Sequence, residues 1–152
     1  MDKVKVVLYG VGEVGCRIAR HLLEKEGIEI VGAIDVAKDK INKDLGEILG
    51  LSKRLGVKIS DNPNTVLSKV KPNIVVHATS SFLKQIYPQI ETCIKHGANV
   101  VSTCEELSYP YATDSQIAKK IDTSAKKQKV TVLGTGINPG FLMDTLVITL
   151  TG

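Results

Sequence analysis

The run over residues 5–15, KVVLYGVGEVG, constrains the fold more than any other part of the chain. Apolar β-forming residues lead directly into Gly10, Gly12 and Gly15, which have the spacing G-x-G-x-x-G, and a helical pattern follows. Gly10 allows a tight turn out of the strand, Gly12 leaves room for a pyrophosphate beside the backbone, and Gly15 lets the helix pack closely on the strand. The run therefore predicts a strand, a phosphate-binding turn and a helix in that order.

Two further features predict the rest of a dinucleotide site. The N-terminus of the helix that follows, including Glu13 and Val14, offers backbone N–H groups and a positive dipole end to the phosphates. A second strand over residues 28–34 leads to Asp35, twenty residues beyond Gly15. An acidic residue at that distance usually binds the ribose hydroxyls of adenosine. NAD is therefore the favoured cofactor.

The stretch after Asp35 keeps NADP open as a second cofactor. It carries Lys38, Lys40 and Lys43. These lysines have two interpretations: a solvated helix face, or contacts to the 2′-phosphate that distinguishes NADP from NAD. The sequence alone does not separate the two.

Strands alternate with helices along the whole chain. The expected strands span residues 6–9, 28–35, 56–60, 73–78, 98–103 and 130–133. The expected helices span residues 13–26, part of 36–51, a short segment that starts in the turn at 61–64 and ends near residue 70, part of 82–95, 116–127 and 140–150. Val14, Ile18 and Leu22 are expected to face inward on the first. Such alternation predicts a single-domain Rossmann-type α/β fold, a doubly wound parallel sheet with strand order 3-2-1-4-5-6. Its ligand is expected over the carboxyl ends of the strands.

Composition narrows the function classes. With 152 residues, a net charge of +4 and only 4% aromatic residues, the chain lacks the basic, aromatic-rich footprint of a nucleic-acid-binding protein. No apolar run approaches the ~20 residues of a membrane span. Met1 runs almost directly into the first strand, so no signal peptide is expected. An odd number of cysteines without C-x-x-C spacing favours reduced thiols and a cytoplasmic protein, and no set of metal ligands is evident.

Small and polar residues follow the later strands, where a Rossmann fold holds its ligand. The hydroxyls after the fourth strand fit either contacts to ribose and phosphate or caps for the next helix. His77, at the end of that strand, is interpreted as a structural histidine rather than a catalytic one. Asn138 and Pro139 also suit the N-cap and first positions of the last helix. The additional candidate cofactor contacts are Ala78, Thr79, Ser80, Thr103, Cys104 and Asn138.

Five motifs together give the chain a family resemblance. They are GVGEVG at 10–15, AID at 33–35, HATSS at 77–81, STCEEL at 102–107 and GTGINPGFLMDTL at 134–146. With them the chain resembles 2,4-diaminopentanoate dehydrogenase and the native amine dehydrogenases, which are similar in fold to dihydrodipicolinate reductase. The last two motifs are much more specific than the first, and the resemblance covers the whole chain.

The resemblance implies a function and a domain arrangement. Enzymes of this family oxidise the 4-amino group of 2,4-diaminopentanoate to a ketone with NAD or NADP and release ammonia. Residues 1–152 would be the NAD(P)-binding Rossmann domain. A second α/β domain, which completes the substrate pocket and makes a homodimer, would be absent from this chain.

Glu105 and Glu106 are the catalytic candidates. They follow the fifth strand, where the nicotinamide end of the cofactor is expected, and oxidative deamination needs a carboxylate that binds an ammonium group and moves protons. From the residues alone, adjacent loop glutamates are more often solvated or cap the next helix. The resemblance implies the catalytic role for one of them, with a slight preference for Glu105. The neighbouring Cys104 is expected to pack as a small hydrophobic residue rather than to act as a nucleophile.

Two other functions fit the same sequence. One is a two-domain reductase of the dihydrodipicolinate reductase or homoserine dehydrogenase type. The other is a non-catalytic module that binds a dinucleotide or senses redox state. Whether the gene continues beyond Gly152 would separate a catalytic protein from such a module.

Overall fold

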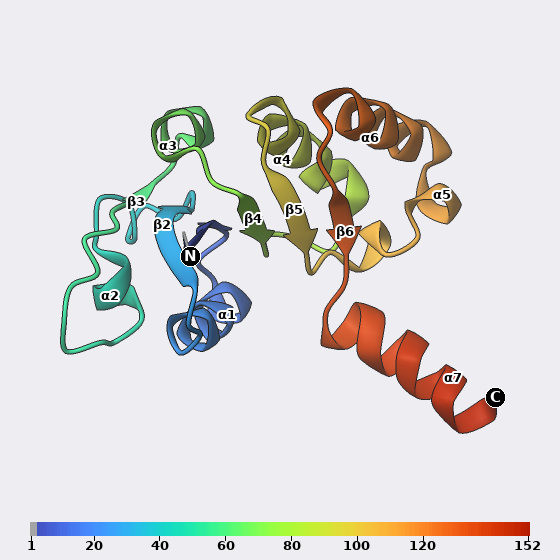
Figure 1. Ribbon diagram of the computed structural model, residues 1–152, viewed down its shortest axis with the longest axis horizontal. Coiled ribbons are helices and arrows are strands. Elements are labelled where there is room, and N and C mark those ends of the chain that lie inside the picture. Colours follow the sequence, from blue (N-terminus) through green and yellow to red (C-terminus); the bar gives the residue numbers. More distant parts are fainter. Residues whose placement is uncertain (1–2) are drawn as a thin grey trace. The chain divides into compact units, whose positions relative to one another are not determined.

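A six-stranded sheet with the order β3-β2-β1-β4-β5-β6 organises the computed structural model, which describes residues 3–152 (Figure 1). The strand pairs β1–β2, β1–β4, β2–β3 and β5–β6 are parallel. The predicted fold class and strand order are therefore confirmed. The chain divides into two compact units, Met1–Ala78 and Thr79–Gly152, which are described in turn.

The described part of the first unit, residues 3–78, contains four strands and three helices. Its core joins β1, β2 and β3 to α1 and α2 through buried residues such as Leu8, Ala19, Ile30 and Leu45. Helix α3 packs against β2 and lies on the opposite side of these strands from α1 and α2 (Figure 1). The elements are β1 (Val4–Tyr9), α1 (Glu13–Leu23), β2 (Ile28–Ile34), α2 (Leu45–Ile48), β3 (Ile59–Ser60), α3 (Pro63–Val70) and β4 (Ile74–His77).

Local chemistry explains why these elements begin and end where they do. Val6, Val7 and Leu8 of β1 are buried on both faces of the sheet, as expected for a parallel strand. Asn62 caps α3 by accepting a hydrogen bond from the backbone N–H of Thr65, with Pro63 in the first turn. The predicted start of this helix is confirmed.

The second unit places its helices beside two strands. Helices α4 and α6 lie side by side, α4 packs against β5, and α6 packs against β6 (Figure 1). Its core contains Ile86, Ile90 and Ile94 of α4, together with Ile121 of α6. The elements are α4 (Leu83–Lys95), β5 (Asn99–Ser102), η1 (Glu105–Leu107), α5 (Pro110–Thr113), α6 (Ser115–Gln128), β6 (Val132–Gly134), η2 (Ile137–Thr145) and α7 (Leu146–Thr151).

Several details of the first unit differ from the prediction. Helix α1 ends at Leu23, three residues early, and Val14 is 52% exposed rather than inward-facing. The buried positions of α1 are Gly15 and Ala19. At Gly15 no larger side chain fits, because the helix lies against the carbonyl of Gly10. The helix expected within residues 36–51 is a single turn, α2.

The predicted cap of the last helix is wrong. Asn138 and Pro139 have non-helical backbone dihedrals, and Gly140 has φ of +110°, a conformation that favours glycine. The regular helix begins only after Gly140, whose N–H donates to the carboxylate of Asp144 at 2.9 Å. Asn138 is exposed and lies before the helix.

No helix among residues 3–152 is long and apolar enough to cross a membrane.

Candidate functional site

The turn between β1 and α1 has the geometry that its three glycines predict. Gly10 has φ of +99°, which lets the chain leave the strand sharply. A Cβ atom at Gly15 would lie 2.0 Å from the carbonyl oxygen of Gly10, so only glycine fits there. A Cβ atom at Gly12 would meet no heavy atom within 4 Å, so the space beside that backbone is open. A pyrophosphate needs such an opening.

The N-terminus of α1 is also open to an anion. Gly12 is the N-cap of this 11-residue helix, and no side chain caps it. The first-turn N–H groups of a helix have no partners within the helix, so they are available to a phosphate. The carboxylate of Glu13 pairs with Arg17 one turn further along, and both side chains are exposed. The residues present therefore fit a dinucleotide phosphate.

The ends of β1, β2 and β4 meet within the first unit. The N–H of Gly10 donates to the carbonyl of Ile34 at 2.8 Å, and the N–H of Ala78 donates to the carbonyl of Tyr9 at 2.7 Å. Three of the predicted cofactor contacts, Gly10, Asp35 and Ala78, thus lie at neighbouring strand ends. This agrees with the rule that ligands bind at the carboxyl ends of parallel strands.

Asp35 is held in place by backbone donors. Its Oδ2 accepts from the N–H of Val11 at 2.7 Å and its Oδ1 from the N–H of Ala37 at 2.9 Å. Burial raises the pKa of this carboxyl, but the two N–H donors and the ammonium of Lys40 outweigh burial and leave the pKa below its ordinary value. Asp35 is therefore ionised at neutral pH and can accept hydrogen bonds from hydroxyl groups.

Lys40 touches the same turn. Its Nζ donates to the carbonyl of Val11 at 2.8 Å and lies 3.6 Å from Oδ2 of Asp35. The sequence showed a group of three lysines in this stretch without indicating which of them reaches the turn. Lys38 is exposed, and Lys43 pairs with Glu47 at 3.7 Å.

His77 is fully buried at the end of β4. Its ring meets that of Tyr9 edge-on, with 5.4 Å between the ring centroids. Such an aromatic contact in the core supports the structural interpretation of this histidine.

In the second unit, the hydroxyls after β4 bond to α4. Oγ1 of Thr79 donates to Gln89 and Oγ of Ser80 donates to Gln85, each at 2.6 Å. Oγ of Ser80 also accepts from the N–H of Phe82 at 3.3 Å, at the start of the helix. These bonds support the helix-start interpretation of Ser80, and contact with a ribose stays a prediction for both residues.

Glu105 and Glu106 differ sharply in their surroundings. The carboxylate of Glu106 accepts from the N–H of Leu83 at 2.7 Å, which satisfies a free donor at the N-terminus of α4. Its own N–H donates to the carbonyl of Ser81 at 3.3 Å. Glu105, in contrast, has an exposed side chain at the first position of η1. Glu106 therefore caps a helix, but the helix is the preceding α4 and not the following one that the sequence suggested.

Thr103 and Cys104 connect β5 to these glutamates. Thr103 is half-buried and Cys104 is buried. Burial raises the pKa of the Cys104 thiol, and the nearby carboxylates of Glu105 and Glu106 act in the same direction. A thiol that stays protonated is a poor nucleophile, which supports the packing role. All three cysteines of the chain are free thiols.

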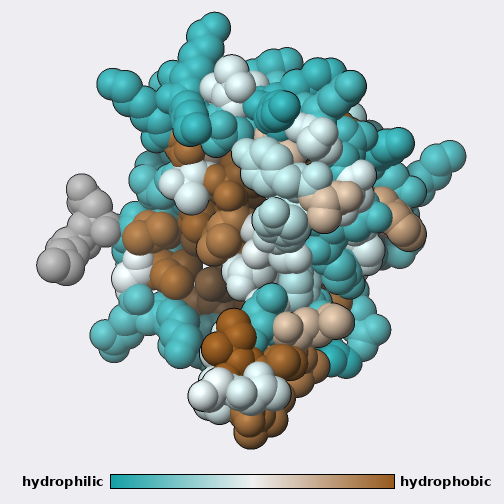
Figure 2. All heavy atoms as spheres, turned by 90° about the vertical axis from the view of Figure 1, so that its right-hand side faces the viewer, coloured by the Kyte–Doolittle hydropathy of each residue, from teal (hydrophilic) through white to brown (hydrophobic). Residues whose placement is uncertain are grey.

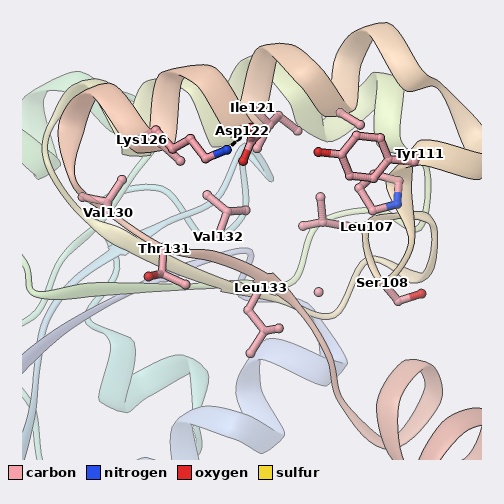
Figure 3. A pocket seen from close by; sticks show the side chains of 14 residues that line it. Leu107, Ser108, Tyr111, Ile121, Asp122, Lys126, Val130, Thr131, Val132 and Leu133 are labelled. Carbon is pink, nitrogen blue, oxygen red and sulfur yellow. Dashed lines mark hydrogen bonds and ion pairs between the residues drawn. The ribbon is translucent and has the colours of Figure 1, made fainter.

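A separate cavity of about 380 Å³ lies between α6 and β6 in the second unit (Figure 3). Apolar side chains of Leu107, Ile121 and Val132 line it, together with Tyr111. At its rim Lys126 donates to Asp122 at 2.8 Å. None of the residues predicted to bind the cofactor or to catalyse a reaction lines this cavity, so it is distinct from the candidate site.

Comparison with known proteins identifies the family. The sequence profile of the family described as "Dihydrodipicolinate reductase, N-terminus" matches residues 4–108. The chain belongs to this family. Its domains bind NAD(P), which agrees with the open glycine turn and with Asp35. The family match includes β1 to β5 and both candidate glutamates.

Individual relatives extend the match to the rest of the chain. A 2,4-diaminopentanoate dehydrogenase from Acetoanaerobium sticklandii is 36% identical over 167 residues, which include all of this chain and 43% of the relative. The solved structure of an amine dehydrogenase from Mycobacterium smegmatis superposes with a TM-score of 0.91 at 37% identity, over 97% of this chain and 43% of that one. The resemblance to these dehydrogenases is thereby confirmed.

A reductase is also among the relatives. The 4-hydroxy-tetrahydrodipicolinate reductase of Carboxydothermus hydrogenoformans is 32% identical over 94% of this chain and 49% of its own length. The chain thus spans about half or less of the length of these relatives. It is homologous to NAD(P)-dependent dehydrogenases and reductases.

Proposed function

We propose that this chain is the cofactor-binding part of an enzyme that oxidatively deaminates a small amine, with 2,4-diaminopentanoate as the leading substrate. The observation that carries the cofactor part is the open turn at Gly12 beside the ionised Asp35. The substrate class rests on the dehydrogenase relatives, whose similarity extends over the entire chain. NAD is the favoured cofactor because a carboxylate at the end of β2 suits the ribose hydroxyls.

The reaction needs a general acid–base group that accepts and donates protons at the amine. When bound, the nicotinamide ring accepts a hydride from the carbon that carries the amino group. We assign to Glu105 the binding of the substrate ammonium, the removal of its proton, and proton transfer when water replaces ammonia. Its exposed carboxylate, three residues beyond the end of β5, is accessible for this role. Glu106 has a different role, because its carboxylate caps α4.

A second domain would complete the substrate pocket. Much of η2 and α7 is apolar and exposed, including Phe141 (50%), Met143 (69%), Ile148 (69%) and Leu150 (75%). Figure 2 draws one face of the molecule and shows hydrophobic side chains gathered at its lower end, where the C-terminal helix lies. Contiguous apolar surface of this kind is rare on a soluble monomer. We propose that a further domain, in the part of the longer relatives that this chain does not match, covers this surface and forms a homodimer.

A reductase of the dihydrodipicolinate type is the second candidate. The observation that favours it is the 32% identity to such a reductase over 94% of the chain. It would use the same cofactor turn and transfer hydride to its substrate rather than from it. Either enzyme would work in the cytoplasm, where the three free thiols would stay reduced.

The test is turnover by the full-length protein that contains this chain. With NAD and 2,4-diaminopentanoate, NADH should form, whereas residues 1–152 alone should bind the cofactor without turnover because they supply only part of the cleft. In the full-length protein, Glu105→Gln should lower kcat by about a hundredfold or more. The matched variant Glu106→Gln retains an acceptor for the N–H of Leu83 and should keep most of the activity.

Three results would contradict this proposal. Full activity in Glu105→Gln would remove that residue from proton transfer. Robust turnover by residues 1–152 would overturn the need for a second domain. Reduction of a dihydrodipicolinate-type substrate, without activity on the diamine, would favour the second candidate.

A further inference from the structure

Asp35 and Lys40 hold the same residue of the phosphate turn from two sides. The carboxylate accepts from the N–H of Val11 at 2.7 Å, and the ammonium donates to the carbonyl of Val11 at 2.8 Å. Val11 itself is 1% exposed and belongs to the core of the first unit. The two charged groups therefore have fixed positions next to the predicted ribose site.

The pairing changes the charge that a bound nucleotide would meet. A lone carboxylate at the end of β2 favours NAD and repels the 2′-phosphate of NADP. Here the ammonium of Lys40 lies 3.6 Å from that carboxylate, and the two side chains are only 22% and 11% exposed. Solvent screening is weak for a pair with so little exposure, so the ammonium offsets much of the carboxylate's negative field.

We propose that Lys40 is the residue that lets this site accept NADP as well as NAD, an inference that rests on the proposed dinucleotide site. Its ammonium supplies the positive charge for the 2′-phosphate, while Asp35 remains the acceptor for the ribose hydroxyls. Lys38 and Lys43 do not share this placement: the first is exposed and the second pairs with Glu47. One residue of the three is thus assigned as the specificity determinant.

A purely structural role for Lys40 would have a different signature. If the ammonium only braces the carbonyl of Val11, its loss disturbs the phosphate turn that both cofactors share. NAD and NADP would then lose affinity by the same factor. A role in specificity changes the ratio of the two affinities.

The experiment is calorimetric titration of residues 1–152 with NAD and with NADP. In the unmodified chain we expect NAD to bind at least as tightly as NADP, with a difference of no more than about tenfold. Lys40→Gln should weaken the binding of NADP by about 10- to 100-fold and the binding of NAD by less than about threefold. Lys38→Gln is the matched control and should leave both affinities unchanged. Lys40→Arg retains the charge and should retain NADP binding.

Salt dependence provides a second readout that needs no variant. Raising KCl from about 50 to about 300 mM should weaken NADP more than NAD in the unmodified chain, because the extra phosphate contact is ionic. An unchanged ratio of affinities in Lys40→Gln, or equal losses for both cofactors, would overturn the inference. Failure of the unmodified chain to bind either cofactor would instead overturn the proposed site on which it rests.

Discussion

The phosphate turn and the C-terminal segment, residues 137–151, differ in how completely their groups are satisfied by contacts within the chain. Around the turn, Asp35 and Lys40 satisfy both polar backbone groups of Val11, and Gly15 packs against Gly10. Nothing outside the first unit is needed to fix this geometry. The C-terminal segment, in contrast, exposes large apolar side chains such as Ile137 (73%) and Leu150 (75%).

This difference bears on cofactor binding and on catalysis in different ways. A cofactor can be held by a preformed turn, because the glycine geometry and the charged groups are already in place. Rate acceleration needs the reacting carbon to be held near the hydride acceptor with water excluded, which requires opposing walls. We therefore expect the cofactor-binding half to work by itself and the chemistry to need a partner for the exposed apolar segment.

The largest effect should come from breaking the packing of the turn. Alanine usually stabilises a helix relative to glycine by roughly 0.5–1 kcal/mol. At Gly15 the added Cβ would lie 2.0 Å from the carbonyl oxygen of Gly10, so Gly15→Ala should destabilise the chain by about 3 kcal/mol or abolish folding. Thermal unfolding followed by circular dichroism measures the change.

Gly12→Ala is the matched control for that experiment. Its Cβ would meet nothing within 4 Å, and its φ of −78° suits any residue. The melting temperature should stay within a few degrees of that of the unmodified chain. Equal stability of the Gly12 and Gly15 variants would contradict the close approach of α1 to the turn.

A smaller effect should appear in acid. Asp44 fixes the loop that follows it by accepting from the N–H groups of Gly46, Leu55 and Gly56. These bonds, led by that from Leu55, lower the pKa of its carboxyl from the ordinary value of 3.8. The stabilisation from the ionised form is therefore complete above about pH 4 and is lost as the pH falls through the lowered pKa.

Denaturant unfolding at several pH values tests this carboxylate. Asp44→Asn cannot offer the second carboxylate oxygen to the N–H of Gly56. The variant should therefore be less stable at neutral pH and should lose less stability when the pH is lowered. The exposed Asp39 provides the control, since Asp39→Asn should keep the acid sensitivity of the unmodified chain. Identical pH dependence in Asp44→Asn and the unmodified chain would show that Asp44 does not cause the loss of stability in acid.

Sequence patterns predicted the parts of the structure that depend on neighbouring residues. The alternation of strands and helices predicted the strand order, and the spacing of Gly10, Gly12 and Gly15 predicted the turn. The turn over residues 61–64 predicted a helix start that the structure contains. Each of these signals is local, because it arises from backbone conformation or from periodic burial.

The features that the sequence did not predict depend on contacts between residues far apart in the chain. The carboxylate of Glu106 caps a helix that begins 23 residues earlier, and Lys40 reaches a turn 29 residues before it. No local pattern distinguishes Glu106 from Glu105 or Lys40 from its neighbours. The predicted cap at Asn138 failed for the opposite reason: a good local signal was overridden by the non-helical backbone over Asn138, Pro139 and Gly140.

Titration of NAD into residues 1–152 and into Gly12→Val tests most directly whether the glycine turn binds a dinucleotide. We predict single-site binding of NAD to the unmodified chain with a dissociation constant below about 1 mM. Gly12→Val should remain folded, because the space beside Gly12 is open, and should bind at least about tenfold more weakly, because its side chain fills the position predicted for the pyrophosphate. Absence of binding to the unmodified chain, or unchanged affinity in a folded Gly12→Val protein, would contradict the assignment of this turn as a dinucleotide site.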